Sequence, residues 1–527
     1  MSGTVNRSWR TMFALAVTLA ATAAAVATAR ADSAELDLVL RHGTVIDGSG
    51  APRRVADVGV IGGRIAAVGD LSKRSAKIEI DATGLYVTPG FVNIHSHATL
   101  EGLARAENML TQGVTTEIVN ADGSGPLSLG EQMDAFGKAG LAINVGGYIG
   151  FNSVWAAVMG DTNHRARPED IARMRGLVTA GLEAGAWGVS AGLDYKPAYY
   201  ATTEEVIKVV EAARGWSTNF TNHDRLTPEN HLSSVAAAGE TLQIGAATGT
   251  LPVVTHMKAQ GRDNGRAGDI IALMDGERIP AVGDVYPYLA GMTALRAFFI
   301  PGWAQEGGRA AMLKRFADPG LRKRIAAEAD KLIAARIAGG MDGIRLIEKG
   351  RRLGEVAREL GVGPGEAVIH VLEESDTPMI ADFGIEKDLE VFLRAPRVAI
   401  SCDCGASTET RTHPRVYGTF PRVLGRYVRE RGVLTWEEAI RKMTSLPAHI
   451  IGAHDRGRLE ANLTADITVF DPKTVIDHAT YEQPALPSEG IRYVIVNGQV
   501  ALDHGKTTGI QAGKALRRSR DGGDGRH

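Results

Sequence analysis

The chain of 527 residues carries 59 Lys and Arg against 61 Asp and Glu, which gives a net charge of -2 at pH 7. A nearly neutral chain lacks the basic surplus that nucleic acids and anionic membranes attract, so we expect no nucleic-acid partner. Hydrophobic residues make up 44% and charged residues 23%, as in ordinary globular proteins. The length allows a barrel-sized catalytic domain together with a second module.

The N-terminal segment, residues 1–31, has the pattern of a signal peptide. Two arginines precede an alanine-rich apolar run from Met12 to Ala29, and small residues stand at Ala29 and Ala31. We expect cleavage after Ala31, a secreted, periplasmic protein and no stable membrane insertion afterwards. The alternative is an uncleaved membrane anchor, because the run approaches the roughly 20 residues that span a bilayer. Its alanine and threonine content favours cleavage.

Short strands with alternating apolar and polar residues occur near both ends of the chain, in residues 36–89 and 450–515. Because these two segments differ in pattern from the long middle, they predict one β-rich accessory domain, a β-sandwich, built from both chain ends. The tail over 517–527 is charged and Gly-rich, and we expect it to be disordered.

The middle of the chain, residues 90–449, alternates short apolar strands with helical stretches. Examples are VTTEIVN before LSLGEQMDAFGKAG, and PVVTHMK before AGDIIALMDG. This alternation indicates parallel βα units, and a count near eight predicts an α/β fold of the TIM (β/α)8 barrel type. The rhythm breaks into charged helical sequence at about 301–384, which we interpret as a small inserted subdomain or lid.

Cys402 and Cys404 are the only cysteines. On an extended strand, a gap of one residue makes a disulfide between them geometrically poor. We therefore expect no disulfide, and a fold that is held by its core alone. On a regular strand both cysteines point to the face opposite Asp403, where small side chains pack behind the barrel.

Four of the 14 histidines lie at the carboxyl ends of predicted strands. His95 and His97 are two residues apart, so both imidazoles point the same way on a strand; His223 ends STNFTNH and His256 ends PVVTH. Asp403 ends VAISCD in the same way, and active sites of TIM barrels lie at this end of the strands. Two histidines with this spacing are common on surfaces, but the ordered set of imidazoles and a carboxylate predicts a zinc site.

Asp403 is also the predicted catalytic residue. A zinc ion lowers the pKa of a bound water to about 7 and polarises a carbonyl. Asp403 is placed to take the proton of the water and to return it to the leaving amine. A purely metal-ligating role is the alternative, and the two roles are compatible.

In these residues the chain resembles the amidohydrolase superfamily and, within it, the D-aminoacylase (N-acyl-D-amino-acid deacylase) branch. The resemblance covers about 37–516 and rests on GFVNIHSH, GVTTEIVNADG, GVSAGLDYKPAYYATTEE, VVTHMK, DVYPYLAG and HPRVYGTFPRVLGRYVRE, in this order. It implies that His223 and His256 hold a tightly bound zinc ion. It also implies that His95 and His97 serve a second, weaker metal position, so the cofactor is one or two zinc ions.

The chain departs from the branch at several positions of the site. Asp122, in NADG, stands where the branch usually has a cysteine metal ligand, so the resemblance places a harder carboxylate ligand there. Ala98 and Thr99 replace acidic residues, Gly150-Phe151 replaces a Gly-His pair, and SCDC replaces an SDG-type sequence. These departures leave the number of metal ions open.

Four side chains are suited to bind a substrate that carries a free carboxylate, and the resemblance supports all four. Arg415 fits a bidentate clamp on the carboxylate, and Lys258 points toward the same mouth of the barrel. Tyr195 and Tyr288 are suited to donate to the carbonyl oxygen as its charge develops. The structural alternative is a solvated cation or a core tyrosine with a paired hydroxyl. Two residues are expected to support these groups, Arg225 and His413.

The expected reaction is hydrolysis of the amide bond of N-acyl-D-amino acids, which are small molecules, to a carboxylic acid and a D-amino acid. Another amidohydrolase reaction, on a cyclic amide, a dipeptide or a xenobiotic amide, is the alternative among enzymes. A catalytically inactive barrel that binds a ligand is the alternative of another class. The sequence leaves the oligomeric state open, including a homo-oligomer.

Overall fold

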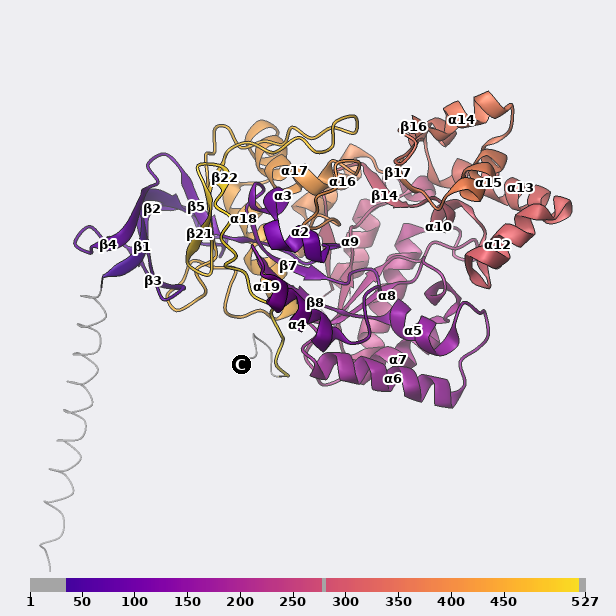
Figure 1. The fold of residues 1–527 in the computed structure, drawn as a ribbon, viewed down its shortest axis with the longest axis horizontal. Coiled ribbons are helices and arrows are strands. Elements are labelled where there is room, and N and C mark those ends of the chain that lie inside the picture. Colours follow the sequence, from indigo (N-terminus) through magenta and orange to yellow (C-terminus); the bar gives the residue numbers. More distant parts are fainter. Residues whose placement is uncertain (1–34, 277–280, 521–527) are drawn as a thin grey trace, which may run out of the picture.

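The computed structural model describes residues 35–276 and 281–520. Three parts follow one another along its longest axis (Figure 1): a sheet built from both chain ends, a central barrel, and an inserted unit at the far end. The expected leader over 1–31 lies outside the described residues. Within the described ranges, no helix has both the length and the apolar character needed to cross a membrane.

The two chain ends meet in one nine-stranded sheet, which we call the composite sheet. Its strands are β1 (Leu36–Val45), β2 (Arg54–Ile61), β3 (Arg64–Gly69), β4 (Ala76–Asp81), β5 (Tyr86–Pro89), β19 (Ile467–Phe470), β20 (Ile491–Val496), β21 (Gln499–Asp503) and β22 (Lys506–Thr507). The order is β22-β21-β20-β19-β5-β1-β2-β3, and β4 pairs with β1. Strand β19 joins the two ends because it pairs antiparallel with both β5 and β20.

Apolar side chains from both chain ends share one core in the composite sheet. Leu38 and Val58 from the first segment pack in the same cluster as Ile467, Val469 and Ile495 from the second. The alternation of apolar and polar residues puts these side chains on one face of the strands. The sequence pattern therefore determines which face is buried.

Parallel strands form the central barrel. They are β6 (Phe91–Asn93), β7 (Val114–Val119), β8 (Asn144–Gly147), β9 (Ile149–Gly150), β10 (Val189–Gly192), β11 (Asn219–His223), β12 (Leu251–Val254), β13 (Val282–Val285) and β18 (Val398–Ile400). Strand β9 continues β8 after one residue, and every pairing among these strands is parallel. A parallel bridge between Ser96 and Cys404 joins the ends of β6 and β18, so the ring closes and the predicted barrel is confirmed.

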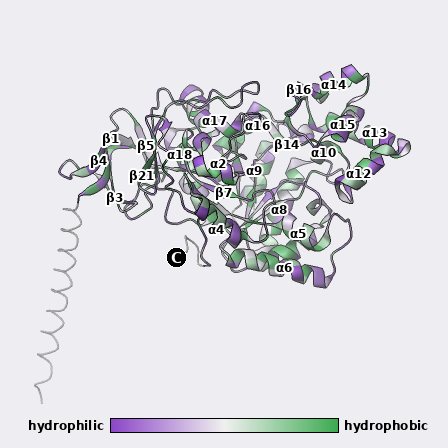
Figure 2. Cartoon of the chain, viewed as in Figure 1, coloured by the Kyte–Doolittle hydropathy of each residue, from purple (hydrophilic) through white to green (hydrophobic). Residues whose placement is uncertain are grey.

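Helices surround the barrel strands. They are α2 (Leu100–Arg105), α3 (Glu107–Leu110), α4 (Leu129–Ala139), α5 (Phe151–Met159), α6 (Pro168–Glu183), α7 (Thr203–Val210), α8 (Ser234–Thr248), α9 (Ala267–Gly276), α16 (Glu386–Arg394), α17 (Arg415–Arg422), α18 (Trp436–Met443) and α19 (Ser445–Ile451). A π-helical turn, Val423–Glu430, continues α17. Helix α7 begins with a capping box, in which Thr202 and Glu205 satisfy each other's backbone N–H groups. Figure 2 shows hydrophilic and hydrophobic residues interleaved along these helices, as expected for helices that cover a barrel.

The inserted unit has its own sheet and its own apolar core. The sheet has the order β14-β17-β15-β16, and the core lies between it and the helices. Its elements are β14 (Ala290–Ala294), β15 (Ile344–Leu346), β16 (Arg351–Arg352), β17 (Pro378–Asp382), α10 (Leu295–Phe299), α11 (Gly302–Gln305), α12 (Gly308–Ala317), α13 (Pro319–Arg336), α14 (Leu353–Leu360) and α15 (Pro364–Glu374). The sheet already begins at Ala290, before the expected start at 301, because the short segment AGMTA has no charged residue to mark the change.

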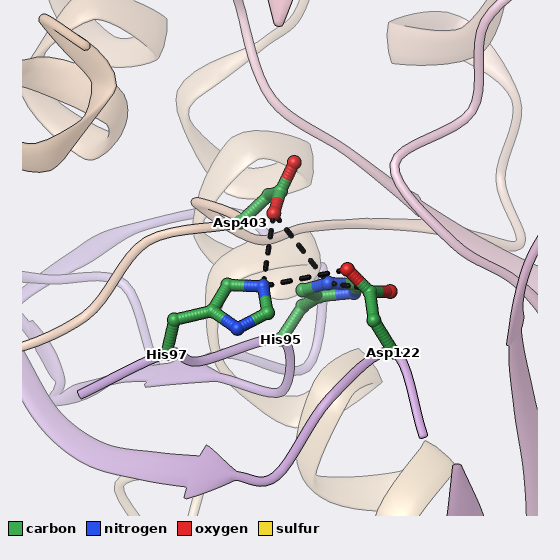
Figure 3. A group of neighbouring side chains, drawn as sticks. All are labelled: His95, His97, Asp122 and Asp403. Atoms are coloured by element: carbon green, nitrogen blue, oxygen red, sulfur yellow. Dashed lines mark ion pairs between the residues drawn. The ribbon is translucent and has the colours of Figure 1, made fainter. Parts of the chain in front are cut away.

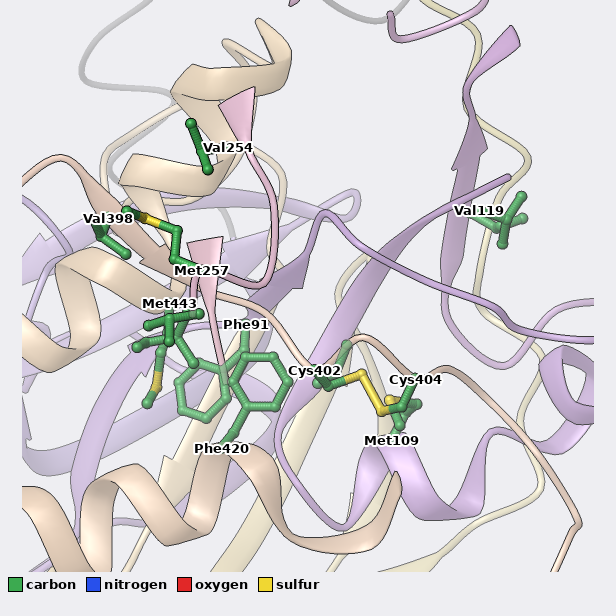
Figure 4. Packing of buried hydrophobic residues seen from close by; sticks show 14 of the residues in the cluster. Phe91, Met109, Val119, Val254, Met257, Val398, Cys402, Cys404, Phe420 and Met443 are labelled. Atoms are coloured by element: carbon green, nitrogen blue, oxygen red, sulfur yellow. A yellow bond between two sulfur atoms is a disulfide. The ribbon is translucent and has the colours of Figure 1, made fainter. Parts of the chain in front are cut away.

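The expectation that the chain contains no disulfide is wrong. Cys402 and Cys404 form a disulfide, with their Cα atoms 5.0 Å apart (Figure 4). The expectation assumed a regular strand, but β18 ends at Ile400 and Asp403 has a φ of +47°. This left-handed residue turns the chain, so the two cysteine side chains meet instead of running parallel away from Asp403.

The expectation of disorder from residue 517 onward is also wrong for its first residues. Arg517 forms an ion pair with Asp134 at 2.6 Å, and Arg518 donates to the Ser217 carbonyl at 2.8 Å. These contacts tie Arg517 and Arg518 to the barrel helices and loops. The remainder of the tail, 521–527, lies outside the described residues.

Candidate metal centre

The mouth of the barrel collects the predicted metal-binding residues from different strands. They lie at, or within a few residues of, the carboxyl end of a parallel strand: His95 and His97 after β6, Asp122 after β7, His223 at the end of β11, His256 after β12, and Asp403 after β18. Because these strands are parallel, their carboxyl ends gather on one face of the barrel. Residues far apart in the sequence thereby become neighbours.

His95, His97, Asp122 and Asp403 form the first group of possible ligands (Figure 3). The Nε2 atom of His97 lies 3.2 Å from Asp403 Oδ1 and 3.5 Å from Asp122 Oδ2. The Nε2 atom of His95 lies 3.3 Å from Asp122 Oδ1 and 3.6 Å from Asp403 Oδ1. The four side chains therefore direct nitrogen and oxygen atoms at one small volume.

His223 and His256 form the second group, together with the same Asp122. The two imidazoles face each other with His223 Nδ1 and His256 Nε2 2.8 Å apart. Asp122 Oδ1 lies 3.7 Å from His256 Nε2, and its Oδ2 lies 3.8 Å from His223 Nδ1. Asp122 thus lies between the two histidine pairs and is within reach of both.

The donor set passes a test of fit for a metal ion. Both ring nitrogens of His95 and the Oδ1 atom of Asp122 are buried and make no hydrogen bond within the described structure. Unsatisfied buried polar atoms are costly in a folded protein, unless another group binds them. Within each group the candidate ligand atoms lie within 4.8 Å of one another. Imidazole and carboxylate donors in this arrangement suit zinc.

Three of the six side chains belong to residues with left-handed backbone. The φ angles are +55° at Asp122, +33° at His256 and +47° at Asp403. For residues other than glycine this conformation is sparsely populated and costs about 1–3 kcal/mol each. Such residues cluster at functional sites, where the surrounding fold holds side chains in required directions.

Charge complementarity holds the first group together. Burial alone would lower the pKa of His97, but the Asp122 and Asp403 carboxylates raise it to about 10. Burial would raise the pKa of Asp403, but Arg415 and the neighbouring imidazoles hold it well below its usual range. In the second group, burial and the nearby His256 lower the pKa of His223 to about 3. The second pair of histidines is therefore neutral, which is the form that binds a metal ion.

Arg415 has a position that the sequence did not predict. Its Nη1 lies 2.7 Å from Asp403 Oδ2, so the guanidinium holds the carboxylate from the side opposite His95 and His97. His413 supports this pair, because its Nδ1 accepts a hydrogen bond from the Arg415 backbone N–H at 3.0 Å. His413 is thus a supporting residue, as expected.

Lys258 and Tyr195 lie beside the metal-binding groups, as predicted. The ammonium of Lys258 lies 4.2 Å from the ring centre of Tyr286, and burial lowers its pKa to about 7. The ring of Tyr195 packs against His223, with centroids 4.5 Å apart, and its hydroxyl lies 3.1 Å from Thr293 Oγ1. Both side chains line cavities at the mouth of the barrel.

The structure directs Tyr288 away from the place predicted for it. Its hydroxyl donates to Asp477 at 3.3 Å and lies 3.5 Å from the Pro414 carbonyl oxygen, so it is paired on the outer side of the site. Tyr286 lines the cavity instead, and its buried hydroxyl makes no hydrogen bond within the described structure. The two tyrosines of YPY exchange roles because β13 ends at Val285 and the chain turns after it.

Asp284 is a site residue that the sequence reasoning missed. It is buried on β13, accepts a hydrogen bond from the His256 backbone N–H at 2.9 Å, and lies 3.9 Å from His95 Nδ1. It therefore holds the backbone of His256 in place and puts a carboxylate near His95. A carboxylate inside an apolar barrel strand, in AVGDVY, was the signal that could have identified it.

Arg225 lies farther from the centre. It pairs with Glu240 and donates to the Tyr199 carbonyl at 3.0 Å, which fastens the loop that follows Tyr195. The expected supporting role therefore concerns this loop and not the histidines.

A cavity of about 540 Å³ opens from the first group of ligands toward solvent. Four charged or metal-binding side chains line it: His97, Asp122, Asp403 and Arg415. The rest of its wall includes small polar side chains, together with Met292 and Lys196. The volume is in the range of pockets for small molecules. A small molecule that fills this cavity would lie against His97, Asp122 and Asp403.

Fold and site together define a metal-dependent hydrolase-type centre at the mouth of an α/β barrel. A model of the amidohydrolase family matches residues 79–502, and the chain belongs to this family. The chain is 35% identical to the D-aminoacylase of Alcaligenes xylosoxydans xylosoxydans, over 93% of this chain and 99% of that protein. It is 34% identical to the N-acyl-D-glutamate deacylase of the same organism, over 88% of this chain and 93% of that protein.

A solved structure leads to the same assignment. A crystal structure of D-aminoacylase has a TM-score of 0.78 and 32% identity, with coverage of 92% of this chain and all of that one. The N-acyl-D-glutamate deacylase of Bordetella bronchiseptica, solved with zinc and a phosphonate inhibitor, has a TM-score of 0.77 and 30% identity over the same share of this chain. The resemblance drawn from the sequence motifs is therefore confirmed.

Proposed function

We propose that the protein is a zinc-dependent hydrolase that cleaves the amide bond of N-acyl-D-amino acids into a carboxylic acid and a D-amino acid. The observation that carries the proposal is Asp122, which lies between the two histidine pairs beside the catalytic candidate Asp403. The deacylases to which the chain is similar along almost its whole length support the choice of substrate.

His223, His256 and Asp122 would hold one zinc ion, and His95, His97 and Asp403 surround the place for a second. When bound, zinc would polarise the amide carbonyl and lower the pKa of a water molecule in the site to about 7. By the resemblance to the D-aminoacylase branch, Asp122 stands where a thiolate ligand is usual, and a carboxylate is harder and suits zinc less strongly than sulfur does. We therefore expect this protein to lose the zinc ion more readily than a protein with a cysteine ligand at this position.

Asp403 moves the proton in this reaction. Its Oδ1 faces His95 and His97, and its Oδ2 is held by Arg415. Fixed in this way, the carboxylate accepts a proton from the attacking water and delivers it to the amide nitrogen as the carbon–nitrogen bond breaks. The water oxygen ends in the carboxylic acid, and the proton leaves with the amine.

Arg415 and Lys258 supply the positive charge that the free carboxylate of the substrate needs. Both lie beside Tyr286, at 4.8 Å and 4.2 Å from its ring centre. The ring of Tyr195 packs against His223, and its hydroxyl, 3.1 Å from Thr293 Oγ1, is the donor that we assign to the negative charge on the carbonyl oxygen.

An assay of metal-loaded protein tests the function. N-acetyl amino acids in D and L form should be compared with a dihydropyrimidine and with a dipeptide, and zinc content should be measured in parallel. We expect turnover of D-enantiomers only, loss of turnover with a chelator, and recovery with zinc. Turnover of the cyclic amide or the dipeptide alone would favour the other amidohydrolase reactions. Less than one zinc ion per chain, with no turnover of any substrate, would favour a binding protein.

We also propose that the chain is exported to the periplasm and cleaved after Ala31. The arginines and the apolar run that precede this position support the proposal. N-terminal sequencing of the protein from a periplasmic fraction tests it. Asp32 should be the first residue, and an intact Met1 in the membrane fraction would contradict cleavage.

A further inference from the structure

The cavity at the mouth of the barrel contains a cation that the proposed reaction does not use. Arg415 and Lys196 line this cavity, and Lys258 lies in the smaller cavity beside it. An N-acyl amino acid has one free carboxylate, and Arg415 with Lys258 already supplies the charge for it. Lys196 is therefore left without a role in the reaction as proposed.

Lys196 is half-buried in the wall that separates this cavity from a larger one of about 1150 Å³, and it follows Tyr195 in the chain. Its Nζ lies 4.0 Å from the ring centre of Tyr199 and 3.3 Å from the Asp194 carbonyl oxygen. Burial lowers its pKa to about 8, which leaves the ammonium largely protonated at neutral pH. A buried cation normally has an anionic partner in the folded protein.

Among the described residues, no carboxylate forms an ion pair with Lys196. The nearest candidate in the chain is Asp194, but its Oδ2 pairs with Arg336 at 3.4 Å and its Oδ1 accepts from the Leu226 N–H at 3.2 Å. The Asp194 side chain is thus used elsewhere and offers Lys196 its backbone oxygen. The charge of Asp194 raises the pKa of Lys196, but Arg336 and Arg296 act in the opposite direction, so the residues around the ammonium do not neutralise it.

Position and charge together suggest what the missing partner is. The cavity runs from His97, Asp403 and Arg415 to Lys196, and its volume of about 540 Å³ holds a small N-acyl amino acid. A substrate whose amide lies at Asp403 and whose α-carboxylate lies at Arg415 has two remaining arms, the acyl group and the side chain, and in an N-acetyl amino acid the acyl arm is only a methyl group. We propose that Lys196 binds a carboxylate in this side chain, so that the preferred substrates are N-acyl derivatives of acidic D-amino acids. This inference rests on the proposed function.

A pair of substrates that differ in charge and not in size tests the inference. N-acetyl-D-glutamate and N-acetyl-D-glutamine, and likewise the aspartate and asparagine pair, should be compared by kcat/KM on the zinc-loaded enzyme. We expect the acidic member of at least one pair to be favoured by about 10- to 100-fold, the effect of one hydrogen bond to a charged group. Lys196→Met should remove this preference by lowering only the acidic rate, and Lys196→Arg should keep most of it.

Lys208→Met is the matched control, because Lys208 is exposed on α7 and pairs with Glu204 at 2.7 Å. This variant should keep the wild-type ratio. Equal rates for acidic and neutral substrates in the wild type would overturn the inference. An equal loss for both substrates in Lys196→Met would also overturn it, since Lys196 would then bind the α-carboxylate.

A binding measurement separates this inference from the proposed function. The affinities of D-glutamate and D-glutamine, which are products and are not turned over, can be measured by calorimetry on the zinc-loaded wild type and on Lys196→Met. A preference for D-glutamate that Lys196→Met abolishes, without hydrolysis of any N-acyl amino acid, would support the role of Lys196 and refute the deacylase. Hydrolysis of N-acyl-D-amino acids without any preference for acidic side chains in binding or rate would support the deacylase and refute the role of Lys196.

Discussion

In the composite sheet, Ile467 and Ile495 lie opposite each other on antiparallel strands and point into an apolar core. At the mouth of the barrel, Asp122 and Asp403 lie beyond the ends of their strands, with left-handed backbone, and turn charged groups toward buried histidines. In the composite sheet, the backbone conformation that the residues prefer is the one that the fold requires. At the mouth of the barrel, the fold holds Asp122 and Asp403 in a left-handed conformation that such residues rarely adopt. Substitutions in the sheet should therefore cost stability, and substitutions at the mouth should cost activity.

The largest expected effect on activity comes from Asp403→Asn. The amide keeps the shape of the side chain but can neither accept nor return the proton, so kcat should fall by about 10³-fold. The variant should remain folded, and binding of the first zinc ion, for which Asp122, His223 and His256 are the proposed ligands, should remain near that of the wild type. A variant that keeps a tenth of the wild-type kcat would show that Asp403 is a ligand only.

Ile467→Ala tests the other side of the comparison. Ile467 is fully buried on β19, and loss of its side chain leaves a cavity where the two chain ends meet. We expect a loss of about 3 kcal/mol in the free energy of unfolding, measured by denaturant titration. The kcat/KM of the folded variant should stay within about twofold of the wild type. A large loss of activity at unchanged stability would break the comparison.

Removal of the Cys402–Cys404 disulfide should have an intermediate effect. The disulfide joins the two residues on either side of Asp403. The backbone N–H of Cys402 also donates a hydrogen bond to the Asn93 side chain at 3.0 Å. Without the bond, the backbone of Asp403 has more freedom, and loss of positioning should reduce kcat by about tenfold. Cys402→Ser/Cys404→Ser can be compared with wild type treated with a phosphine, and a thiol count should show two reactive thiols only after reduction. Unchanged kcat in both would show that hydrogen bonds alone hold Asp403.

The smallest expected difference separates the two tyrosines of YPY. Tyr286→Phe removes an unpaired hydroxyl from a side chain that lines the cavity, and loss of one hydrogen bond to the substrate should lower kcat/KM by about fivefold. Tyr288→Phe removes a hydroxyl that is bonded to Asp477, so kcat/KM should not change measurably, although the melting temperature should fall slightly. The reverse order of effects on kcat/KM would restore Tyr288 as the substrate-binding residue.

The sequence predicted the site wherever a side chain follows directly from a strand. His223 ends β11, and His95 with His97 follows β6, so the gathering of parallel strand ends was enough to place them together. Asp122 was found only through the resemblance, because a carboxylate in a turn has no distinctive spacing of its own.

The missed features depend on backbone angles and on long-range contacts. The φ of Asp403 decided the pairing of the cysteines, and a strand pattern cannot reveal a left-handed residue. Tyr288 points away from the cavity because its hydroxyl donates to Asp477, which is distant in the sequence. Asp284 lies inside an apolar run, which predicts its place on a strand but not its contact with His256.

The disulfide around Asp403 also bears on how the protein matures. The chain has two cysteines, so oxidation within one molecule has a single outcome and needs no sorting among pairings. The bonded residues are separated by one residue, and so the ring can close in a nascent chain before any strand of the barrel has found its neighbour. Cells that keep thiols reduced would make this protein without that ring. Preparations from an oxidising and from a reducing compartment would then have the same sequence and differ in the segment that carries Asp403.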